Sequence, residues 1–130
     1  MHVIKAAAGE TQDLSDRPLF DGGQVWRRAL AGAPATAGND AAVSGDFSFA
    51  IVQFAAGART LPHRHTSDQI LYVLAGIGKV GAAQEERVIS AGDFAFIPAH
   101  EDHWHGAADT GSPMSHIAIT RSDSTTTIST

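Results

Sequence analysis

The chain has 130 residues, of which 43% are apolar, and it carries a formal net charge of −5. These values fit one globular domain with a buried core and exclude a disordered chain. Nine lysines and arginines stand against fourteen acidic residues, which excludes a basic nucleic-acid-binding surface. There is no cysteine, so any metal must bind to imidazole, carboxylate, amide or water rather than to thiolate.

The first residues, MHVIKAAAGETQDLSD, lack the basic segment and the long apolar segment of a signal peptide. No apolar run approaches the ~18 residues that are needed to span a membrane. We therefore expect a cytoplasmic protein that acts on neither membranes nor nucleic acids.

Residues 1–46 are expected to form an N-terminal arm, an edge strand and a loop. Arg17 precedes a proline, which disfavours helix, and a turn is indicated by Asp21-Gly22-Gly23. The segment QVWRRAL at 24–30 can form a strand, whereas the glycine- and alanine-rich residues 31–46 are expected to form the loop.

Residues 47–121 are expected to form the core of a β-barrel. The segment FSFAIVQFA, which begins at Phe47, is apolar at both alternations and predicts a strand buried on both faces. A strand at 70–74 and short strands around 79–80, 86–89, 94–97, 103–107 and 115–120 follow, separated by glycine and proline turns. Such spacing is typical of an all-β sandwich or barrel. The polar residues 122–130 are expected to be a frayed tail.

Six of the seven histidines lie between positions 63 and 116. His63 and His65 are two residues apart, as are His103 and His105, so each pair can point to one face of a strand. Gln69 heads an otherwise apolar row on the strand that follows. Imidazole binds divalent cations readily and an amide oxygen can complete the site. The pattern therefore predicts one divalent metal inside a small barrel.

A single H-x-H pair is more often a surface feature than a metal site, but two pairs on two strands favour the metal. His100 lies just after Pro98 in a turn, beside two acidic residues. We expect it to be solvated or to support a ligand rather than to bind the metal itself.

The stretch from Gly57 to Gly76 resembles the first motif of the cupin family, G-x5-H-x-H-x3-E-x6-G. Its histidines are His63 and His65, and Gln69 stands where that pattern has glutamate. The resemblance implies a double-stranded β-helix, or jelly roll, commonly paired as a dimer, so we expect a homodimer or a higher homo-oligomer.

The stretch from Gly92 to Ala107 resembles the second cupin motif, G-x5-P-x-G-x2-H-x3-N. His103 matches its histidine, His100 replaces the inner glycine and Ala107 replaces the asparagine. The two motifs together imply four metal ligands: His63, His65, Gln69 and His103.

The amide at Gln69 removes one negative charge from the ligand set. We expect weaker metal binding but a stronger Lewis acid. This departure argues against cupins that use the glutamate, such as oxalate decarboxylases, and favours those with three histidines and one glutamine.

A second resemblance is to short bacterial cupins that act as manganese-dependent hydroxynitrile lyases, related to cupins associated with carboxymuconolactone decarboxylase. Shared segments are GART at 57–60, WHGAA at 104–108 and MSHIAI at 114–119. The resemblance implies that His105 and His116 line the pocket and that one of them exchanges the proton of a cyanohydrin. For His116 the alternative is a histidine satisfied by backbone groups in the last strand.

We therefore expect a lyase in which a metal polarises the oxygen of a small hydroxyl or carbonyl substrate. Manganese or iron is expected, although nickel, cobalt and zinc also suit the ligands. The walls of the pocket are expected to be apolar and formed by Phe49, Phe54, Leu71, Val73 and Ile97.

Three other functions fit the same residues. One is a dioxygenase of the quercetinase or diketone-cleaving type, and another is a non-catalytic binding module. The third is a sugar-handling cupin that opens unsaturated uronates. That function requires basic residues to bind a carboxylate, and only Arg59 and Arg64 are near the motif.

Overall fold

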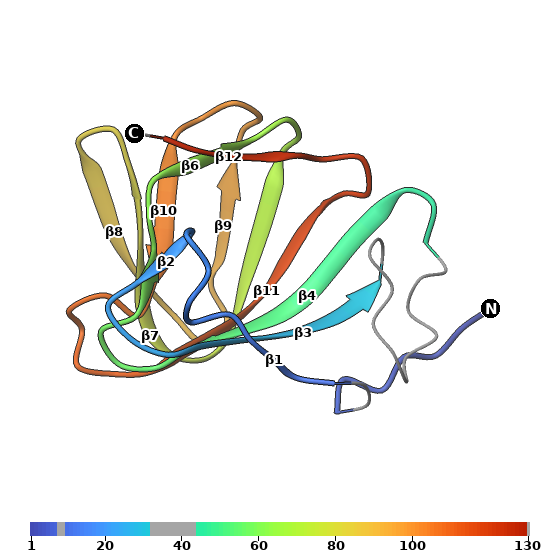
Figure 1. The fold of residues 1–130 in the computed structure, drawn as a ribbon, viewed down its shortest axis with the longest axis horizontal. Helices are drawn as coiled ribbons and strands as arrows, with labels where there is room; N and C mark the ends of the chain where they lie inside the picture. Colours follow the sequence, from blue (N-terminus) through green and yellow to red (C-terminus); the bar gives the residue numbers. More distant parts are fainter. Residues whose placement is uncertain (8–9, 32–43, 130) are drawn as a thin grey trace.

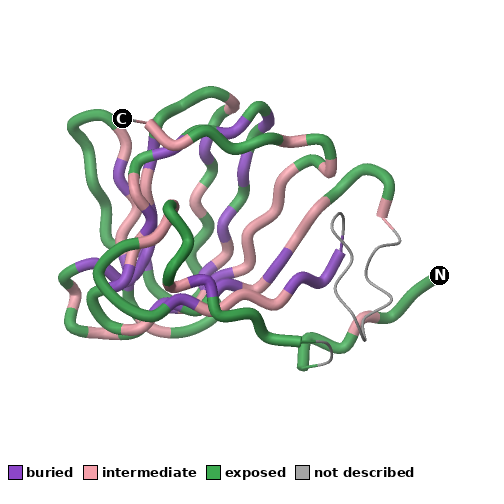
Figure 2. The backbone as a smooth tube through the Cα atoms, viewed as in Figure 1, coloured by how far each residue is buried: buried purple, intermediate pink, exposed green. Residues whose placement is uncertain are grey.

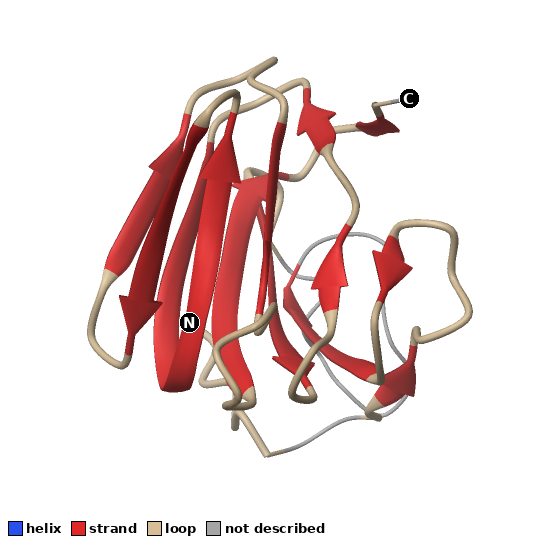
Figure 3. Cartoon of the chain, turned by 90° about the vertical axis from the view of Figure 1, so that its left-hand side faces the viewer, coloured by secondary structure: helices blue, strands red, loops and turns tan. Residues whose placement is uncertain are grey.

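The computed structural model describes residues 1–7, 10–31 and 44–129, and every regular element within them is a β-strand (Figures 1 and 3). The strands are β1 Gln12–Asp13, β2 Phe20–Asp21, β3 Val25–Ala31, β4 Phe47–Phe54, β5 Arg59–Thr60, β6 His63–His65, β7 Gln69–Ala82, β8 Glu85–Ser90, β9 Phe94–Ile97, β10 His103–Gly106, β11 Met114–Arg121 and β12 Thr126–Ile128. The all-β prediction is confirmed. These ranges contain no helix with the length and apolar character that crossing a membrane requires.

The strands form two sheets that share β7. The first half of β7 pairs with β11 and β9, in the sheet that continues through β4 and β3 to β1. The second half pairs with β8 and β10, and that sheet also holds β2, β5, β6 and β12. We call these the first sheet and the second sheet. This arrangement places the inner faces of both sheets around one interior.

The chain changes sheet within β7 near Gly76, which has φ 79°. A Cβ atom at Gly76 would collide with the carbonyl oxygen of Pro113, so the close approach of β11 requires glycine here. The separate strands expected at 70–74 and 79–80 are therefore one continuous strand of 14 residues.

Alternation along the strands separates the interior from the surface. β6 and the start of β7 alternate between buried and less buried residues (Figure 2). On β4 and β11, Val52 pairs with His116 and Phe54 pairs with Met114, and all four are buried. Val52, Phe54 and Met114 belong to one apolar core cluster, together with Val25, Ala58, Val73, Ile89 and Ala107.

Two expectations for the flanking segments have different outcomes. The prediction of a frayed C-terminal tail is wrong in part. Thr126–Ile128 forms β12, which pairs antiparallel with the available edge of β6. The predicted loop at 31–46 lies mostly outside the described residues; Ala31 is the last residue of β3, and residues 44–46 lead into β4.

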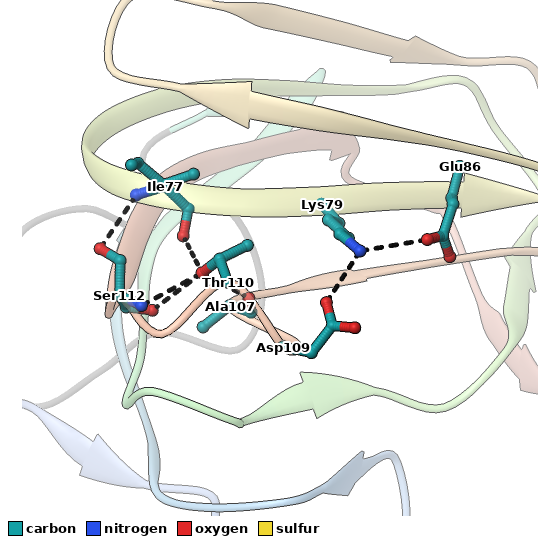
Figure 4. A network of polar contacts seen from close by, with 7 residues as sticks. All are labelled: Ile77, Lys79, Glu86, Ala107, Asp109, Thr110 and Ser112. Atoms are coloured by element: carbon teal, nitrogen blue, oxygen red, sulfur yellow. Dashed lines mark hydrogen bonds and ion pairs between the residues drawn. The ribbon is translucent and has the colours of Figure 1, made fainter.

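The loop between β10 and β11 is tied to β7 by polar contacts (Figure 4). Oγ1 of Thr110 lies 3.0 Å from the carbonyl oxygens of both Ile77 and Ala107, and it accepts a hydrogen bond of 3.2 Å from the main chain of Ser112. Lys79 forms ion pairs with Asp109 at 2.8 Å and with Glu86 at 3.1 Å. These contacts fix the positions of the strands that carry His105 and His116.

Candidate metal centre

The two histidine pairs lie side by side on the inner face of the second sheet. On β6, His63 and His65 are buried and Arg64 between them is exposed. On β10, His103 and His105 are buried, and β10 pairs with β6 through His103 and His63. The pairing brings together side chains that are about forty residues apart in the chain.

The imidazole rings form a compact cluster. Ligand atoms of His63, His103 and His105 all lie within 4.8 Å of one another. The ring centroid of His63 is 4.3 Å from that of His103 and 4.9 Å from that of His65. Of the predicted ligands, His63 and His103 belong to this group of three and His65 lies beside it. His105, which was expected to exchange protons, also offers an atom to the group.

Main-chain carbonyls determine which nitrogen carries the proton in two of the rings. Nδ1 of His63 donates to the carbonyl oxygen of Leu61 at 2.8 Å, and Nδ1 of His103 donates to that of Glu101 at 2.9 Å. A neutral ring that carries its proton on Nδ1 has a lone pair on Nε2. Both rings therefore present a lone pair, as histidine ligands with a supporting carbonyl do.

Gln69 contributes a further oxygen at the same place. Its Oε1 atom lies 3.0 Å from Nε2 of His103, which bears the lone pair. Two acceptors at this distance repel each other unless a proton or a cation lies near both, or the amide is turned to donate. A cation bound between them removes this repulsion, so the donor set fits a metal.

His65 supplies a second observation in favour of a metal. Its Nδ1 atom lies 2.9 Å from Oγ1 of Thr126 on β12, whereas its buried Nε2 atom has no hydrogen-bond partner among the described residues. A buried polar nitrogen without a partner costs free energy, and a bound cation would satisfy it. The four residues His63, His65, Gln69 and His103 thus fit a divalent metal.

Burial keeps the rings of the cluster neutral. It lowers the pKa of His63 to about 3 and that of His65 to about 4. It also lowers the pKa of His103, and it holds the pKa of His105 well below the usual range, with neighbouring histidines adding to the effect. Neutral imidazole is the form that binds metals, so these rings are ready to bind at pH 7.

His105 and His116 form a hydrogen-bonded pair next to the cluster. Nε2 of His116 lies 2.9 Å from Nδ1 of His105, so one ring donates to the other. The main-chain N–H of His105 donates to Oγ1 of Thr60 at 3.0 Å. His116 is fully buried behind His105, and burial lowers its pKa to about 4.

His100 lies apart from the cluster. It is exposed, and its main-chain N–H donates to the carbonyl oxygen of His65 at 2.8 Å. Its φ angle of 69° is in the left-handed region that favours glycine, which explains why the cupin pattern has glycine at this position.

A cavity of about 640 Å³ opens onto the cluster and is lined by His63, His65, Gln69 and His105. None of the five expected wall residues lines it. Phe54, Leu71, Val73 and Ile97 are buried in the core, and Phe49 points to the outer face while its neighbours Ser48 and Ala50 line the cavity.

The N-terminal segment supplies cavity walls that the sequence patterns do not predict: Leu14, Arg17, Pro18, Leu19 and Phe20, together with Arg27 on β3. The two arginines expected near the site do not line it. Arg59 stacks on the ring of Trp104 at 4.8 Å, and Arg64 pairs with Asp102 at 3.3 Å. The sequence offers two signals for these walls, the turn at Arg17-Pro18 and the possible strand QVWRRAL. Neither signal indicates that this part of the chain folds over the histidines.

Comparison with known families identifies the fold. The model of the cupin domain matches residues 50–120, which is more than half of the chain. The chain is a cupin. The prediction of a jelly-roll barrel is therefore confirmed.

This cupin resembles one curated relative over part of its length. It is 47% identical over 73 residues to a protein of Granulicella tundricola named (R)-mandelonitrile lyase. The match covers 54% of this chain and 53% of the relative, so the chain spans about half the length of the curated relative it matches.

Solved structures of other cupins agree with the fold. A cupin-like protein from Thermotoga maritima superposes with a TM-score of 0.71 at 28% identity, over 95% of this chain and 83% of that one. The polyketide cyclase RemF from Streptomyces resistomycificus gives a TM-score of 0.76 at 17% identity, over 95% of this chain and 80% of that one, and shows the fold alone. The similar proteins thus include a lyase and a cyclase.

Proposed function

We propose that this cupin is a metal-dependent enzyme that cleaves or forms cyanohydrins, like a hydroxynitrile lyase. The observation that carries the proposal is the convergence of the rings of His63, His65 and His103 with Oε1 of Gln69, beside a cavity that also exposes His105. The similarity to (R)-mandelonitrile lyase supports the choice of reaction.

The proposed metal ligands are His63, His65, Gln69 and His103, and the expected metal is manganese or iron. A divalent metal held there would act as a Lewis acid that stabilises negative charge on the substrate oxygen. Three neutral imidazoles and a neutral amide leave the full charge of the cation available for this role.

His105 is proposed to move the proton. When a cyanohydrin is cleaved, its hydroxyl proton leaves, the bond between the carbinol and nitrile carbons breaks, a carbonyl forms and cyanide takes up a proton. His105 lines the cavity and is neutral at pH 7, so it can accept the hydroxyl proton and return it to cyanide as hydrogen cyanide. His116 holds the ring of His105 through the hydrogen bond of 2.9 Å.

The test is the release of cyanide from mandelonitrile by the metal-loaded protein. We expect His105→Ala to keep its metal and to lose about 100-fold or more of the rate, because acid–base catalysis contributes on that scale. The matched control is His100→Asn, which alters an exposed histidine outside the cluster at a φ angle that asparagine tolerates, and it should keep the rate. A His105→Ala protein with full metal and full activity would refute the assignment.

A further inference from the structure

Arg27 and Arg17 line the same cavity as the histidine cluster. Arg27 lies on β3 and Arg17 lies in the turn that follows β1. The cavity is therefore lined both by imidazoles and by two arginines.

The register of the first sheet places Arg27 on the inner face. Arg27 pairs with Val52 on β4, and Val52 pairs with His116 on β11. Two steps of about 4.8 Å between strands put Arg27 roughly 10 Å from His116 along the sheet. His105, the hydrogen-bond partner of His116, lines the cavity, so a small molecule of that length can reach from Arg27 to the histidine cluster.

The next residue provides a contrast on the opposite face. The two terminal nitrogens of Arg28 have partners: they donate to the carbonyl oxygen of Ala6 and to Oγ1 of Thr11, each at 2.7 Å. Arg27 and Arg28 thus carry the same charge on the same strand, but only Arg27 lines the cavity.

Neither Arg17 nor Arg27 has an anionic partner in the described part of the chain. The ion pairs found there involve Arg64, Lys79, Arg87 and Arg121. Arg27 is half-buried, and its pKa is lowered first by burial and then by repulsion from Arg17. A half-buried cation next to a like charge is unfavourable unless an anion is bound.

We propose that Arg27 and Arg17 form a carboxylate-binding subsite, and that the substrate is a small organic acid whose hydroxyl or carbonyl oxygen reaches the histidine cluster. The planar guanidinium fork matches a carboxylate in two parallel hydrogen bonds. This subsite would make small organic acids the substrate class of the proposed lyase. The inference rests on the proposed function in one respect, which is that the substrate occupies this cavity.

The experiment compares two probes of the same shape, 4-formylbenzoate and 4-formylbenzamide, by calorimetric titration into the metal-loaded protein. We expect the acid to bind about 10- to 100-fold more tightly than the amide, which is the range for hydrogen bonds to charged groups. In Arg27→Gln the two affinities should lie within about twofold of each other. Arg28→Gln removes the same charge from the other face and should keep the preference.

Arg27→Lys tests whether a weaker preference in Arg27→Gln comes from the lost charge or from a disturbed fold. It keeps the charge without the planar fork, so part of the preference should return. Circular dichroism checks that each variant is folded.

Three results would overturn the subsite: equal binding of acid and amide by the wild type, an unchanged preference in Arg27→Gln, or an equal loss in Arg28→Gln. An unchanged preference in Arg27→Gln would mean that the carboxylate binds elsewhere, for example at the metal. The cyanide-release assay is separate. Preferential binding of the acid without cyanide release would refute the lyase activity and support the subsite. Cyanide release without preferential binding of the acid would support the lyase activity and refute the subsite.

Discussion

The inner and outer faces of the first sheet differ in the side chains that they carry, although the same strands form both. The inner face carries Arg27, His116 and Gln69 on β3, β11 and β7. The outer face of β7 and β9 carries Phe94 and Phe96, whose exposed fractions are 72% and 63%. Strand alternation thus places the few polar groups that can perform chemistry inside, among core side chains, and leaves an apolar surface that can associate.

Two rows of cross-strand neighbours form the apolar outer face. One row is Phe96, Ile70, Ile119 and Phe49, and the other is Phe94, Tyr72, Ile117 and Ile51. All eight side chains are uncharged. An uncharged face of this extent on a monomer indicates an interaction site, and a second copy offers the same face.

The largest expected effect concerns the buried histidines of the interior. In the metal-free protein, burial lowers the pKa of His63 to about 3 and those of His65 and His116 to about 4, whereas unfolded histidine titrates near 6.5. Between about pH 6.5 and pH 4 the unfolded chain binds more protons, so the free energy of unfolding falls as the pH is lowered. Thermal melts of the metal-free protein should show Tm dropping steeply through this window and nearly constant above it. A flat Tm from pH 7 to pH 5 would contradict the burial of neutral rings.

The next effect tests the outer face. We expect the wild type to be a homodimer through this face and Phe94→Glu to weaken the dimer by about 30-fold or more, since a central aromatic residue at an interface contributes about 2 kcal/mol or more. Ile77→Glu is the control, because Ile77 is 43% exposed but lies in the second half of β7, outside the surface hollow that Phe94 and Phe96 line. Sedimentation of the full chain measures both variants. A monomeric wild type, or a Phe94→Glu dimer as tight as the wild type, would refute the prediction that the outer face forms the dimer interface.

Gln69→Glu tests whether the inner face binds the metal through a neutral amide. The added carboxylate should raise metal affinity by about tenfold, or ~1.4 kcal/mol, because opposite charges attract strongly in a buried site. The same charge should weaken the Lewis acid and slow cyanide release. Metal titration with a competing chelator measures the first effect, and unchanged affinity would exclude Gln69 as a ligand.

The smallest effect concerns the loop that joins β10 to β11. Thr110→Val removes the hydroxyl that contacts Ile77 and Ala107 but keeps the shape of the side chain, so the free energy of unfolding should fall by about 1 kcal/mol. Denaturant unfolding measures this. A larger loss of activity than of stability would show that the loop positions His105 and His116 as well as stabilising them.

Local patterns predicted much of the molecule. The alternation of His63, Arg64 and His65 predicted the inward histidines, and the regular turns predicted an all-β barrel. Both follow from the two-residue period of a strand, which depends on nearby residues only.

Contacts made by distant segments were not predictable in the same way. Arg17 and Leu14 line the cavity because the chain before β3 folds across it, and β12 forms because the tail reaches the edge of β6. Phe49 was assigned to the pocket because its strand is apolar on both faces, and such a strand gives no signal of which face is inside.

The measurement that tests the central claim most directly is elemental analysis of the purified protein beside His63→Ala and the His100→Asn control. We expect about one manganese or iron ion per chain in the wild type and in His100→Asn, and its loss in His63→Ala. Absence of metal from the wild type after reconstitution, or full metal in His63→Ala, would contradict a metal centre at this cluster.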